Sequence, residues 1–103
     1  MANKHGKAIT QFYIKGEMVS LRTTDHAQER MEQREVNEFV VAGAVLSLGE
    51  KLFEIDENED FAIIDNDNDT IVIGSRTKNT VYVITVLPRA NCYVKEGTKI
   101  AKI

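Results

Sequence analysis

Apolar residues gather on both sides of a Lys-Gly-Glu segment within residues 9–21 of this chain. The apolar positions are Phe12, Ile14, Met18, Val19 and Leu21. Gly16 lies between the two groups and can supply the positive φ angle that a tight turn between strands requires. The pattern therefore predicts a short N-terminal β-hairpin.

Two helices are predicted after the hairpin. Thr24 or Asp25 can cap the first, and Gln28 completes a capping-box-like arrangement three residues after Asp25. Residues 35–37 interrupt this helix, and Asn37 can cap the second one.

The second helix shows the clearest core-facing stripe. Its apolar residues recur at helical spacing: Val40, Val41, Ala44, Val45 and Leu48. Gly49 stands where a left-handed C-cap is expected. Gly43, inside the stripe, predicts close packing of the helix backbone against a sheet, because glycine costs a helix about 1 kcal/mol relative to alanine.

From residue 51 onward the pattern is that of strands. Four segments are predicted, separated by turn-forming residues: Lys51 to Ile55, Phe61 to Ile64, Thr70 to Ser75 and Thr80 to Leu87. The last is apolar on both faces, which favours a central position, and Pro88 ends it. Tyr93 to Lys95 and Lys99 to Ile103 form either a last short hairpin or a frayed end. The predicted class is α+β, with an N-terminal hairpin, two helices, and a twisted antiparallel sheet of about four strands whose one face the helices cover.

Length and composition limit the classes of protein to which this chain can belong. A chain of 103 residues is predicted to form one domain, with a core at about residues 9–88 and a hairpin or tail at 89–103. With 43% hydrophobic and 28% charged residues, it resembles ordinary soluble globular proteins. No apolar run approaches the roughly 20 residues that span a bilayer, and the polar start is not a signal peptide. These features, with the lone Cys92, predict a reducing, cytoplasmic location and no membrane association.

The net charge of −3 is unevenly distributed along the chain. Residues 1–24 carry four basic and one acidic residue (+3), residues 25–69 three basic and fourteen acidic (−11), and residues 70–103 six basic and one acidic (+5). If the two basic segments fold onto one surface, the protein has a basic and an acidic side. The alternative is that the acidic residues only solvate helices and turns.

His26, Arg30 and Arg34 recur every four residues in the first predicted helix and therefore share one face. Like charges four residues apart are unfavourable by roughly 0.2–0.5 kcal/mol per pair in an isolated helix. These three residues form one column along the predicted helix. The column predicts a partner outside its own helix, either an anionic ligand or a carboxylate such as those of Asp56 to Asp60 or Asp65.

The pattern His-Ala-x-x-Arg-Met-x-x-Arg, formed by His26, Ala27, Arg30, Met31 and Arg34 and followed by the apolar Val36, resembles a family of small bacterial and phage domains. That family is grouped with RelE-type and BrnT-type toxins, which share a fold with several microbial ribonucleases. The resemblance extends from about Leu21 to Leu87. It implies a RelE-like fold, an activity on RNA, and an antitoxin partner.

Metal-independent cleavage of RNA needs a base near the 2′-hydroxyl, cations around the phosphate, and an acid for the leaving oxygen. The candidate catalytic residues are His26, Arg30, Arg34, Arg76 and Tyr82, as a composite site between the first helix and the sheet. The candidate nucleic-acid contacts are Arg30, Lys78, Arg89 and Lys95. Arg30 and Arg76 can each present a planar fork to a phosphate.

No cofactor or metal is expected. Asp65 to Asp69 resembles the opening of a calcium loop, but Thr70 and Arg76 stand where that loop needs Gly and Glu, so a hairpin turn is predicted instead. Two functions remain in competition. One is a RelE-like endoribonuclease or RNA-binding protein. The other is a non-catalytic phage-type interaction module that binds and modulates a host or defence protein. The partners they allow are RNA, an antitoxin or host protein, and a second copy of the chain.

Overall fold

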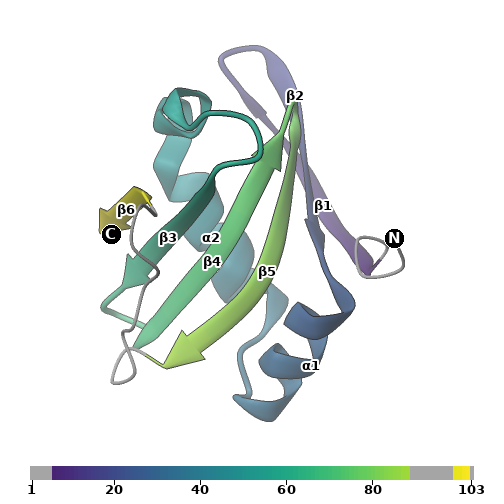
Figure 1. Ribbon diagram of the computed structural model, residues 1–103, viewed down its shortest axis with the longest axis vertical. Helices are drawn as coiled ribbons and strands as arrows, with labels where there is room; N and C mark the ends of the chain where they lie inside the picture. The colour runs from purple at the N-terminus through teal and green to yellow at the C-terminus, as the bar shows by residue number, and fades with distance from the viewer. Residues whose placement is uncertain (1–5, 89–98, 103) are drawn as a thin grey trace.

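The computed structural model describes residues 6–88 and 99–102, which form a six-stranded mixed sheet with two helices packed on one face (Figure 1). The strand order is β1-β2-β5-β4-β3-β6. The predicted α+β class is confirmed. The predicted count of about four strands is too low.

The N-terminal hairpin consists of β1 (Lys7–Ile14) and β2 (Glu17–Thr23). Lys15 and Gly16 connect the strands with φ angles of 53° and 80°. Positive φ at both central residues is the mark of a type I′ turn, whose twist matches that of the flanking strands. The predicted hairpin and the role of Gly16 are confirmed.

Helices α1 (Asp25–Gln33) and α2 (Glu38–Leu48) begin at the predicted caps. The side chain of Thr24 accepts a hydrogen bond from the amide of Ala27, and the side chain of Asn37 accepts one from Val40. Gly49 ends α2 with a φ of 55°. Gln28 does not complete a capping box, because Thr24 rather than Asp25 is the cap and the Gln28 amide turns to the β2 residue Thr23 instead.

The core lies between the helices and the sheet. It contains Ala27 and Met31 from α1, Val41, Ala44, Val45 and Leu48 from α2, and valines of β4 and β5. Gly43 does not pack against the sheet as predicted. It lies on the outer side of α2, where a Cβ atom would find no neighbour within 4 Å.

Strands β3 (Asp60–Asp65), β4 (Thr70–Thr77) and β5 (Thr80–Pro88) form the predicted antiparallel meander. The prediction of a strand at Lys51 to Ile55 is wrong. Residues 51–54 belong to the 3-10 helix η2 (Gly49–Glu54) and Ile55 is its C-cap; the two residues buried in the core, Leu52 and Ile55, are three apart. Three residues make one turn of a 3-10 helix, so Leu52 and Ile55 lie on the same side of this segment and both reach the core.

The pairing of the sheet is mixed rather than antiparallel. Strand β2 pairs with β5 in parallel, because the chain passes through both helices and most of the sheet before it returns to β2. Strand β5 therefore lies between β2 and β4, in the predicted central position. The short β6 (Lys99–Lys102) pairs in parallel with β3 rather than in a terminal hairpin, and Tyr93 to Lys95 lie outside the described residues. The two basic segments, residues 1–24 and 70–103, therefore lie side by side where β2 pairs with β5, whereas their outermost strands, β1 and β6, form the two edges of the sheet.

Candidate nucleic-acid interface

Helix α1 is fixed to the sheet through its N-cap residue, Thr24. The backbone amide of Thr24 donates to the carbonyl of Val83 (3.0 Å), and its hydroxyl donates to the carbonyl of Ile84 (3.2 Å). Both acceptors belong to β5, and Thr24 is buried. The pairing of β2 with β5 ends at Val83. Thr24 thus supplies hydrogen-bond donors to the carbonyl groups of β5 at and just after this point. The position of His26, Arg30 and Arg34, which we name the α1 column, therefore depends on β5.

Within the α1 column, His26 and Arg30 are in contact. The Nε atom of Arg30 donates to Nε2 of His26 (3.4 Å), and its Nη1 atom donates to Oε1 of Gln33 (3.2 Å). His26 is exposed and Arg30 is half-buried. Both acceptors are neutral groups, so neither contact neutralises the charge of the guanidinium.

Arg34 completes the column at the C-cap of α1. Its Nε atom is shut off from solvent and has no hydrogen-bond partner in the part of the chain that the structure describes. The side chain borders a hollow of about 430 Å³ between the end of α1 and the β3–β4 turn, lined also by Glu35, Val40, Asn68, Asp69, Thr70 and Leu87. The hollow contains charges of both signs, because Glu35 and Asp69 are acidic.

No carboxylate lies within 4.0 Å of Arg30 or Arg34 among residues 6–88 and 99–102. This is unexpected in a helix that also contains Asp25, Glu29 and Glu32. The alternative prediction, in which Arg30 binds Asp65 or the acidic loop before β3, is not what the structure shows. Asp65 instead accepts hydrogen bonds from the backbone amide (3.2 Å) and the side-chain amide (2.7 Å) of Asn68.

Arg76 serves a different part of the molecule. Its Nε and Nη2 atoms donate to the carbonyl of Ile55, and its Nη1 atom donates to the carbonyl of Lys78 (2.8 Å). Its guanidinium carbon also lies 5.9 Å from the centre of the Phe53 ring, within cation–π range. Arg76 therefore holds the end of η2 and the β4–β5 turn together.

The composite site expected between α1 and the sheet is not assembled. Thr70, beside Arg34, and Arg76 stand at opposite ends of β4, about 20 Å apart at roughly 3.3 Å per residue. Lys78 follows β4 at the same far end as Arg76. Arg89 and Lys95 lie outside the described residues.

Tyr82 is also separated from the α1 column. On β5 it alternates with Val81 and Val83, which face the helices and are buried in the core. Tyr82 therefore faces the opposite side of the sheet. The second candidate for proton transfer is thus on the side that the helices do not cover.

The segment from Asp65 to Asp69 forms the predicted turn between β3 and β4. Asp69 has a φ of 53°, a value that aspartate tolerates better than most residues. No group of three or more His, Cys, Asp or Glu residues suited to a metal ion occurs in the described ranges. In those ranges, too, no helix is both long enough and apolar enough to cross a bilayer.

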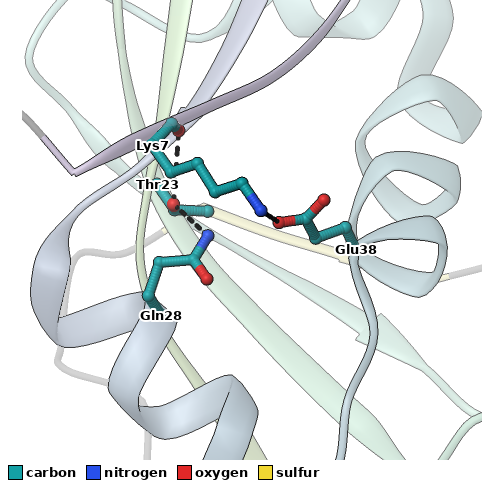
Figure 2. A network of polar contacts seen from close by, with 4 residues as sticks. All are labelled: Lys7, Thr23, Gln28 and Glu38. Atoms are coloured by element: carbon teal, nitrogen blue, oxygen red, sulfur yellow. Dashed lines mark hydrogen bonds and ion pairs between the residues drawn. The ribbon is translucent and has the colours of Figure 1, made fainter.

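A polar network that the sequence did not indicate joins the elements around the column (Figure 2). Gln28 of α1 donates to the hydroxyl of Thr23 on β2 (2.7 Å), which donates to the carbonyl of Lys7 on β1 (3.3 Å). The Lys7 ammonium lies 2.6 Å from a carboxylate oxygen of Glu38 on α2 and is the largest cause that lowers the pKa of Glu38. These partners are far apart in the chain. The only sequence feature that points to the network is the pair Thr23-Thr24 before α1.

Comparisons with family models, with curated proteins and with solved structures found no match to this chain. The resemblance to the RelE-like family therefore depends on the motif of α1 alone.

Proposed function

We propose that this protein binds RNA, as a member of the RelE-like group, and that the α1 column contacts the phosphate backbone. The observation that carries the proposal is that, within the described residues, two guanidinium groups lack a carboxylate to neutralise them. Arg30 and Arg34 have no carboxylate partner in the described part of the chain, although acidic residues surround them in the sequence. Arginine that keeps its charge available can bind a phosphate through two parallel hydrogen bonds.

Cleavage of the bound RNA is a further step of the same proposal. His26 is the group that can accept a proton from a 2′-hydroxyl held beside the column, once a bound phosphate draws Arg30 away from its Nε2 atom. A second proton-transfer group near His26 has less support, because Tyr82 faces the other side of the sheet. The structure thus favours binding over cleavage as the activity to test first.

The test is the affinity for a labelled single-stranded RNA, measured by fluorescence anisotropy at several salt concentrations. We expect Arg30→Ala and Arg34→Ala each to weaken binding and to reduce the slope of log K against log salt by about 0.7 per lost phosphate contact. Lys78→Ala is the matched control, since it removes the same charge at the far end of β4. Failure of the wild-type chain to bind, or an equal loss in Lys78→Ala, would contradict the proposal.

The same labelled RNA serves as the substrate in a cleavage assay. We expect His26→Ala to abolish cleavage while binding and the melting temperature stay close to those of the wild type. A 2′-O-methyl RNA should bind and remain intact, because its attacking hydroxyl is blocked. Equal cleavage by wild type and His26→Ala would assign the reaction to another residue or to a contaminant.

The competing function is a non-catalytic phage-type module that binds a host or defence protein. The observation in its favour is the acidic middle segment, which supplies both helices, η2 and β3 and surrounds the column with exposed carboxylates. Under this alternative the wild-type chain has no affinity for RNA at any salt concentration, and the binding assay distinguishes the two.

A further inference from the structure

Helix α2 is apolar on its outer as well as its inner side. Its sequence contains no charged residue between Glu38 and Glu50. Phe39 is 88% exposed and Leu46 is 49% exposed. A surface helix normally carries polar residues on its outer face, as α1 does, and a helix that is apolar all round is normally buried. In Figure 1, α2 lies behind the sheet as the outer layer of the molecule.

The outer face of α2 carries a projection and a notch. Phe39, Gly43 and Ser47 are four residues apart and lie in one line along the helix. A Cβ atom at Gly43 would meet nothing within 4 Å, so no contact within the chain requires glycine there. The hydroxyl of Ser47 already donates to the carbonyl of Ala44 (2.6 Å), so Ser47 needs no polar partner. The Phe39 ring is thus the projection, and the small residues Gly43 and Ser47 form the notch.

This face is complementary to itself. A second α2 turned by 180° about an axis through Gly43 brings residue 39 opposite residue 47 of the other copy, because both are four positions from the centre. Each Phe39 ring then lies over the small residues of the other helix, which allow a close approach. A second copy of the chain therefore supplies both the projecting ring and the small residues that receive it.

The charges beyond the two ends of α2 fit the same arrangement. Glu35 precedes α2 by three residues and Lys51 follows it by three, both are exposed, and neither has an ion pair in the described part of the chain. The reversed copy brings the end of α2 that Glu35 precedes next to the end of the other α2 that Lys51 follows. The carboxylates at the helix ends are already paired within the chain, Glu38 with Lys7 and Glu50 with Lys15. The arrangement therefore brings opposite charges together at its rim.

We propose that a second copy of this chain docks on the outer face of α2, with the two α2 helices antiparallel and Phe39 of each copy in the Gly43–Ser47 notch of the other. The face is about 16 Å long, from 11 residues at roughly 1.5 Å each. A contact of this size is at the small end of specific interfaces, so a dimer with a dissociation constant in the micromolar range or above is expected. The proposal does not depend on RNA binding.

Sedimentation velocity of the full chain, from micromolar to near-millimolar concentration, tests the proposal. We expect the average mass to rise with concentration from 11.6 kDa toward twice that value. Phe39→Asp should remain a monomer throughout. Tyr13→Asp, the same kind of change at an exposed aromatic residue of β1, should dimerise like the wild type.

Charge exchange tests the antiparallel register. Glu35→Lys should weaken the dimer severalfold, and the double variant Glu35→Lys with Lys51→Glu should restore it. Circular dichroism verifies that each variant is folded. A wild-type chain that stays at 11.6 kDa, or a Phe39→Asp variant that dimerises normally, overturns the proposal. Loss of the dimer in Tyr13→Asp alone places the interface on the β1 edge and overturns it as well.

Discussion

At the scale of single residues, neighbours in space decide what a side chain does. Arg34 and Arg76 are both half-buried arginines. Arg76 donates to two backbone carbonyls, whereas the Nε atom of Arg34 has no partner among the described residues. Arg76 thus holds two backbone segments together, whereas the charge of Arg34 has no carboxylate partner in the described part of the chain.

Substitution of two glycines by alanine should change the free energy of unfolding in opposite directions. A Cβ atom at Gly74 would lie 2.9 Å from the Phe61 ring and 2.9 Å from the Tyr82 carbonyl oxygen. Gly74→Ala should therefore lower the free energy of unfolding by about 1–3 kcal/mol. Gly43→Ala, at an open helical position, should raise it by about 0.5–1 kcal/mol in the monomer. Urea denaturation at low protein concentration measures both, and a neutral Gly74→Ala would show that β4 and β5 separate without strain.

At the scale of elements, η2 shows how a short helix is held in place. It directs Leu52 into the core, and Arg76 binds the carbonyl of Ile55 just beyond its end. That carbonyl accepts from two nitrogens of one guanidinium, a fork that a lysine ammonium cannot reproduce. The tie connects η2 to β4 across a sequence separation that no local pattern reveals.

Arg76→Lys tests this tie. We expect the free energy of unfolding to fall by roughly 1–3 kcal/mol, because charge-assisted hydrogen bonds to a partly buried carbonyl are lost. RNA affinity of the folded variant should not change. Arg30→Lys is the control, since Arg30 holds no backbone carbonyl, and it should leave stability within about 0.5 kcal/mol of the wild type. If Arg76→Lys loses RNA affinity but not stability, Arg76 belongs to the RNA site after all.

At the scale of the whole molecule, the network in Figure 2 joins four elements from β1 to α2. Thr23 at its centre is fully buried, while Lys7 and Glu38 lie at its exposed end. Together with the parallel pairing of β2 and β5, the network connects the N-terminal hairpin to the rest of the sheet. The hairpin and the meander are therefore parts of one sheet.

The pH dependence of stability tests the exposed end of this network. Lys7 lowers the pKa of Glu38 below its ordinary value of 4.5. The pair should therefore stabilise the fold above pH 4.5, and this contribution should be lost as the pH falls through the lowered pKa. Because the pair is exposed, Glu38→Gln should cost only about 0.2–1 kcal/mol at neutral pH and nothing at acidic pH.

Urea denaturation across this pH range measures the difference between wild type and Glu38→Gln. Glu32→Gln serves as the control, because Glu32 is an exposed α1 residue with no ion pair in the described residues. A difference between wild type and Glu38→Gln that grows toward acidic pH would contradict the assignment.

Local features were predictable because they depend on a few neighbouring residues. The turn at Gly16, the caps Thr24 and Asn37, the end of α2 at Gly49 and the β3–β4 turn all follow from backbone preferences and short-range hydrogen bonds. The apolar stripe of α2 was also visible, since its period is that of the helix. The clustering of His26 with Arg30 followed from their spacing of four residues.

The sequence by itself thus determined the helices, the hairpin, the three meander strands and the shared face of the α1 column. Tertiary structure alone decided that β2 pairs in parallel with β5, that Arg76 is a backbone tie at the opposite end of β4 from Arg34, and that Gly43 faces outward. The physical reason is that these outcomes depend on contacts between segments distant in the chain. Their free energy comes from the packing of the whole core and not from the preferences of any one segment.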